Sequence, residues 1–136
     1  ARKGEEKGRE VSHIVAGPSV LKRMELAIEI GLKSKSINNA MQDIADYVGS
    51  GLHISEAVPA VFGLFVAGGG KTMDCIYAGV NIGNDTDTVA TMLGALTGAY
   101  NGYMSLPKEY LSMINERNNI CLEKFAEDFQ SIVRRG

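Results

Sequence analysis

Cysteine is scarce in this sequence, which has only Cys75 and Cys121, far apart in the chain. A disulfide scaffold needs more cysteines, and a zinc site needs cysteine or histidine ligands at short, fixed spacings. Both classes of protein are therefore excluded. We interpret the two residues as buried, reduced thiols of an intracellular protein.

A surplus of positive charge is also missing. The 14 lysines and arginines are outnumbered by 16 aspartates and glutamates, giving a formal net charge of -2. A general nucleic-acid binder would carry a broad basic surface. We therefore expect no nucleic-acid partner.

Long apolar runs are absent as well. The most apolar segment, residues 57–67, is too short to span a bilayer, and the charged N-terminal stretch does not resemble a signal peptide. We therefore expect no membrane partner and a cytoplasmic location.

No segment alternates apolar and polar residues as a strand would, whereas apolar residues recur at helical spacing. The clearest example is the stripe from Ile37 to Val48. The sequence therefore predicts an all-α fold. Helices are expected at about residues 20–31 with Ser19 as cap, 37–48, 55–67, 72–80 and 88–100, then a short helix from Leu106-Pro107, and a last one with the stripe Leu122, Phe125, Ala126, Phe129 and Val133.

Three further features bear on the organisation of the chain. Residues 1–14 form a charged lead-in, interpreted as a solvated helix end or linker, and the chain begins there without a methionine. Gly94, Gly98 and Gly102 repeat every four residues, a spacing that lets another backbone approach one helix face closely. Residues 16–19 read as a turn before the first expected core helix.

The strongest chemical signal is Asp85, Asp87 and Thr88, which place three oxygen-bearing side chains where a loop, residues 81–87, enters a helix. Alternate carboxylates with a neighbouring hydroxyl suit a hard divalent cation, and Gly83 permits the sharp backbone path. The same pattern is typical of ordinary N-capping. The glycine and distal glutamate of an EF-hand loop are not in place.

These residues also resemble a known family. Residues 81–90 and 94–102 are similar to the C-terminal signature of the ADP-ribosylglycohydrolases, Gly-Gly-Asp-Thr-Asp-Thr followed by Gly-Ala-hydrophobic-x-Gly-Ala-x-x-Gly. Residues 49–52 and 56–59 resemble the family's Gly-x-Gly-hydrophobic and Glu-Ser-Val-Pro segments, and Leu106-Pro107 its short exit. The resemblance covers most of residues 15–130.

The resemblance implies an orthogonal helical fold and a hydrolase that cleaves the glycosidic bond between ADP-ribose and a modified group. It implies that Asp85, Asp87 and Thr88 bind metal in a centre of two Mg²⁺ ions, for which Mn²⁺ can substitute. It also implies that Gly51 and Leu52 line the ADP-ribose pocket. Glu56 is expected only to support the start of its helix, and no residue is assigned as the catalytic base.

Two departures qualify the match. Asn84 stands where the family usually has a second glycine; asparagine tolerates left-handed backbone angles, although its side chain narrows the site. The family's other metal cluster, a Thr-Asp-Asp type motif in its N-terminal half, is absent.

We therefore expect residues 1–136 to be the C-terminal half of one domain, inactive and loosely folded alone, whose partners are the N-terminal half and an ADP-ribosylated substrate. Two alternatives remain. One is a catalytically inactive member that acts as a structural or ADP-ribose-binding protein. The other is a self-contained helical module in which the Asp-Thr-Asp-Thr stretch is only a cap.

Overall fold

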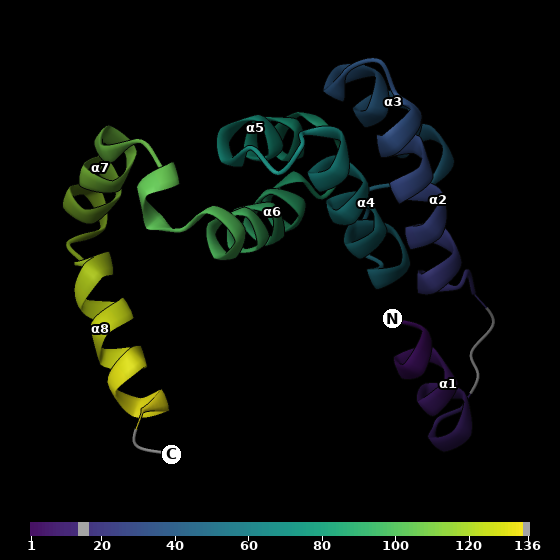
Figure 1. Ribbon diagram of the computed structural model, residues 1–136, viewed down its shortest axis with the longest axis horizontal. Coiled ribbons are helices and arrows are strands. Elements are labelled where there is room, and N and C mark those ends of the chain that lie inside the picture. Colours follow the sequence, from purple (N-terminus) through teal and green to yellow (C-terminus); the bar gives the residue numbers. More distant parts are fainter. Residues whose placement is uncertain (14–16, 135–136) are drawn as a thin grey trace. The chain divides into compact units, whose positions relative to one another are not determined.

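The computed structural model describes residues 1–13 and 17–134, which are helical with no strand among them (Figure 1). The all-α prediction is thus confirmed. The elements are α1 (Arg2–Val11), α2 (Val20–Lys33), α3 (Ile37–Tyr47), α4 (Ile54–Ala67), α5 (Thr72–Asn81), α6 (Thr86–Asn101), the 3₁₀ turn η1 (Tyr103–Ser105), α7 (Lys108–Asn118) and α8 (Leu122–Val133). In this part of the chain, no helix is both long and apolar enough to cross a membrane.

The chain divides into two compact units, which meet in sequence between Gly102 and Tyr103. The first unit contains α1 to α6 and the main core. Its central helix is α4, which contacts α2, α3, α5 and α6 and packs most extensively along α2. Helix α4 is apolar on almost every face, as expected for a helix surrounded by others. Buried residues from five helices meet around it, including Ala27, Ile44, Leu64, Cys75 and Leu93.

Close helix approach depends on glycine, but not on the glycines predicted from sequence. A Cβ on Gly31 would lie 2.5 Å from the carbonyl oxygen of Gly63, so α2 and α4 meet backbone to backbone. By contrast, no described atom lies within 4 Å of a Cβ built on Gly98. Among the described residues, no other backbone approaches the face of Gly94, Gly98 and Gly102, so the close approach predicted there stays a prediction.

The second unit contains η1, α7 and α8. Among its described residues, Leu111 is the one buried hydrophobic side chain, whereas the apolar stripe predicted on α8 is largely exposed, for example at Phe125 and Phe129. Asn119 ends α7 in the left-handed conformation, which is common where a helix reverses into a loop. Cys121 follows it and is exposed, so the prediction that both cysteines are buried is wrong for this one.

Most predicted helices are found within a few residues of their expected ends. Ser19 caps α2, because its side chain accepts a hydrogen bond from the Lys22 amide. The expected turn at residues 16–19 lies partly outside the described residues. Within the charged lead-in, α1 is helical with no buried residue. Helix α6 begins at Thr86 and not at Thr88, so the preceding loop is shorter than expected. The helix expected to be short and to begin at Leu106-Pro107 begins at Lys108 and has 11 residues.

Candidate functional site

Two loops that are distant in sequence meet at the start of α6. One follows α3 and contains residues 49–51; the other, residues 83–85, leads into α6. The Asp85 amide donates a hydrogen bond to the Ser50 carbonyl oxygen at 3.1 Å. The hydroxyl of the buried Ser50 donates back to the Gly83 carbonyl oxygen at 2.9 Å. The structure therefore brings together the two segments that the sequence assigned to metal and to substrate.

The path of the second loop is left-handed at two successive residues. The φ angle is 89° at Gly83 and 60° at Asn84. Glycine adopts such angles without steric cost, and asparagine is among the few other residues that tolerate them. The expectation for the Asn84 backbone is thus confirmed. Its side-chain amide lies against the first loop, with Nδ2 3.1 Å from a Cβ built on Gly51.

The predicted ligands occupy the first turn of α6. Asp85 is the N-cap residue and is half-buried, yet its side chain makes no capping hydrogen bond. Asp87 and Thr88 follow within the first turn and are exposed. Among the described residues, neither carboxylate takes part in a hydrogen bond or an ion pair. Capping therefore does not occupy the side chain of Asp85, and the oxygens of both aspartates keep their capacity to accept.

These side chains suit a hard cation, but they make only part of a ligand set. Mg²⁺ prefers oxygen ligands and takes about six of them in octahedral geometry. Two carboxylates and one hydroxyl supply fewer; waters can complete the shell of one ion, but two adjacent ions need further carboxylates to balance their charge. In the described part of the chain, no three His, Cys, Asp or Glu side chains gather in a metal-binding group. The residues present therefore fit as one side of a metal centre.

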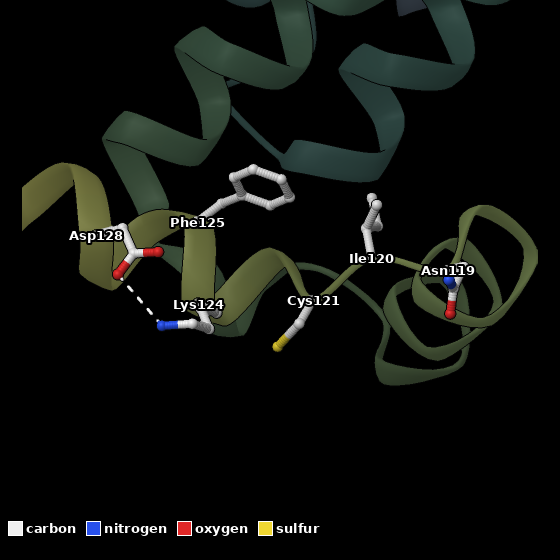
Figure 2. A pocket seen from close by; sticks show the side chains of 6 residues that line it. All are labelled: Asn119, Ile120, Cys121, Lys124, Phe125 and Asp128. Carbon is white, nitrogen blue, oxygen red and sulfur yellow. Dashed lines mark hydrogen bonds and ion pairs between the residues drawn. The ribbon is translucent and has the colours of Figure 1, made fainter.

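The predicted substrate residues differ in what they can offer. Gly51 is buried, and its amide already donates a hydrogen bond to Glu56 Oε2 at 3.0 Å. Leu52 has 85% of its surface exposed and is free to make an apolar contact. The hollow in Figure 2, about 310 Å³ at the start of α8, is lined by Asn119, Ile120, Cys121, Lys124, Phe125 and Asp128. None of them belongs to the predicted site.

Glu56 has a larger role than the sequence indicated. It is the third residue of α4, and its carboxylate reaches back beyond the N-cap, His53, to the amide of Gly51. A glutamate at this position often reaches back to the N-cap amide in a capping box. This contact could have been predicted from a glutamate in the first turn of a helix that shortly follows a Gly-x-Gly loop.

Comparison with known proteins assigns the family. The sequence model described as ADP-ribosylglycohydrolase matches residues 4–135, which is nearly the whole chain. The chain belongs to the ADP-ribosylglycohydrolase family. The family expectation is confirmed, and the helical structure agrees with it. The match does not bear out the placement of the chain in the C-terminal half of the family's domain, which stays a prediction.

One curated relative is the protein named "Uncharacterized protein YegU" from Escherichia coli strain K12. It is 25% identical to this chain over 108 residues, which cover 79% of this chain and 32% of the relative. The chain thus spans about a third of the length of that relative. No solved structure gives a significant match.

Proposed function

We propose that this chain supplies one side of the metal site of a Mg²⁺-dependent ADP-ribosylglycohydrolase, which cleaves the bond between ADP-ribose and a modified group. The observation that carries the proposal is the first turn of α6, where Asp85 and Asp87 have carboxylates without a protein partner among the described residues. Family membership supplies the class of reaction.

In this proposal Asp85, Asp87 and Thr88 hold the metal, and the positive end of the α6 dipole adds to the stabilisation of anions there. When bound, two Mg²⁺ ions would supply charge stabilisation and orient the distal ribose for attack by water at its anomeric carbon. Leu52 would contact the sugar or base through its exposed side chain.

The remaining ligands and the catalytic base would come from the N-terminal half of the domain. Two adjacent divalent ions need more negative charge than two carboxylates provide. The exposed stripe of α8 and the open face at Gly98 also agree with a missing packing partner. Sedimentation and thermal melting of this chain, with and without the N-terminal segment, test this proposal. The two segments together should form a compact protein. If this chain alone is a monomer that unfolds cooperatively and binds Mg²⁺ tightly, the proposal is wrong.

The metal role is tested by Asp87→Ala in the longer protein that contains this chain. Removing the carboxylate takes away a ligand and compensating charge, so Mg²⁺-dependent release of ADP-ribose should be abolished. Asp43→Ala is the matched control, because Asp43 is an exposed aspartate on α3. Wild-type turnover by Asp87→Ala would refute the metal role, and no Mg²⁺-dependent turnover by the wild type would favour an inactive family member.

A further inference from the structure

We infer that Arg23 and Glu56 are positioning residues, which hold the loop of residues 49–51 and, through it, the backbone of Asp85. The inference that this affects metal binding rests on the proposed function; the inference about the loop does not. Neither side chain is assigned as a ligand or a catalytic residue.

The first step is the position of Arg23 beside the backbone hydrogen bond that α4 lacks at Pro59. Pro59 lies inside that helix and has no N–H, so the carbonyl of Ser55, four residues earlier, lacks its usual helical donor. Arg23 Nη1, from α2, donates a hydrogen bond to this carbonyl at 3.3 Å. The guanidinium is thereby anchored at the start of α4.

The second step is the ion pair with Glu56. The same Arg23 nitrogen lies 3.4 Å from Glu56 Oε1, and the two side chains are only 27% and 25% exposed. Partial burial reduces screening of the attraction between these two charges by solvent and salt, relative to a fully exposed pair. Because the other oxygen accepts from the Gly51 amide, both oxygens of Glu56 have protein partners.

The third step is the fit of the loop over this carboxylate. A Cβ on Gly49 would lie 2.9 Å from Glu56 Oε2, and a Cβ on Gly51 would lie 2.6 Å from it. No side chain fits at either position while Glu56 keeps its place. A side chain at Gly51 would thus displace the Glu56 carboxylate, and at Gly49 the φ of 87° favours glycine in addition.

The last step runs from the loop to the metal side. Ser50 lies between these two glycines, and its carbonyl oxygen accepts the Asp85 amide. A continuous set of contacts thus leads from α2, through Arg23 and Glu56, to the N-cap of α6. Groups that orient metal ligands from behind commonly change metal affinity 10–100-fold when they are removed.

The loop is tested by amide hydrogen exchange, followed by NMR, in Glu56→Ala and Arg23→Met. Glu56→Ala removes a charged acceptor, so exchange at Gly51 and Asp85 should accelerate about tenfold or more relative to the core amide of Leu64. Arg23→Met should have a smaller effect in the same direction, which keeps the test decisive if Glu56→Ala does not fold. Glu56→Gln retains an acceptor and should restore part of the protection at Gly51.

The control is Glu29→Gln, which removes an exposed ion pair with Lys33 on α2 and should change neither amide. Unchanged exchange at Asp85 in the folded variants, or acceleration no greater than that at Leu64, would overturn the inference.

The metal part is tested by Mg²⁺ titration of turnover in the longer protein. Glu56→Ala should raise the Mg²⁺ concentration for half-maximal turnover about tenfold, and saturating Mg²⁺ should recover the rate. Turnover that saturating Mg²⁺ does not recover would contradict a positioning role. If the wild type shows no Mg²⁺-dependent turnover, the proposed function fails, and hydrogen exchange still decides the role of the two residues in the loop.

Discussion

The close packing of α2 against α4 predicts that Gly31→Ala destabilises the fold. The new Cβ would lie 2.5 Å from the Gly63 carbonyl oxygen and 3.2 Å from the Ala67 backbone nitrogen. Backbone atoms cannot rotate away as a flexible side chain does, so the two helices must separate. This crossing is the most extensive helix contact in the first unit.

The size of the effect follows from two opposing terms. Alanine is favoured over glycine within a helix by roughly 0.5–1 kcal/mol. Inserting a methyl group into a tightly packed site costs about 1–3 kcal/mol, and the upper part of that range suits a clash with backbone. Gly31→Ala should therefore lower the free energy of unfolding by about 1–2 kcal/mol.

Gly98→Ala is the matched control, because Gly98 also lies within a helix but has no described atom near its added Cβ. Only the helix-propensity term remains, so this variant should raise the free energy of unfolding by roughly 0.5–1 kcal/mol. The assay is urea and thermal unfolding followed by circular dichroism at 222 nm, where 1 kcal/mol corresponds to roughly 4 °C in Tm.

The two variants must therefore differ in sign. A Gly31→Ala protein as stable as the wild type would refute the backbone-packing argument. If Gly98→Ala is destabilising in the longer protein but stabilising in this chain, the Gly98 face is covered by the additional segment.

Three further predictions concern the Asn84 loop, the carboxylate of Glu123 and the two cysteines. Asn84→Ala should lower the free energy of unfolding in urea by about 1 kcal/mol, because a φ of 60° is unfavourable for alanine. Asn84→Gly should not lower it, and equal stabilities of the two variants would contradict this prediction. The pKa of Glu123 is lowered to about 2, chiefly by the hydrogen bond from the Tyr103 hydroxyl. The ionised Glu123 carboxylate therefore stabilises the fold above pH 4.5, and this stabilisation is lost as the pH falls towards 2. NMR titration should show a higher Glu123 pKa in Tyr103→Phe, and an unchanged value would refute that cause. A maleimide should label the exposed Cys121 and spare the buried Cys75, whose thiol pKa is raised by burial; equal labelling rates by mass spectrometry would refute this.

Local features of this protein were readable from the sequence because their causes are local. The stripe from Ile37 to Val48 predicts α3, since helical periodicity depends on residues three and four apart. Ser19 predicts the start of α2 through one hydrogen bond to an amide three residues on. The left-handed backbone of Asn84 follows from residue type, and the signature around Asp85 and Asp87 pointed to the family.

What the sequence missed depends on residues far apart in the chain. The exposure of Cys121 follows from what packs around it, and cysteine alone predicts burial. Gly98 and Gly31 look alike as glycines within helices, yet only Gly31 meets another backbone. Spacing alone could not distinguish them, because a close approach is a property of two helices.

In the candidate site, too, the local features could be predicted from the sequence and the contacts between distant residues could not. The oxygen-bearing residues at the start of α6 and the Gly-x-Gly loop could both be identified from the sequence, but the contacts between them could not. Tertiary structure alone decided that Ser50 binds the Asp85 backbone and that Arg23 reaches Glu56. These contacts join residues more than thirty positions apart. Packing of α2, α4 and α6 around one core places them together, and no local pattern of residue types encodes that arrangement.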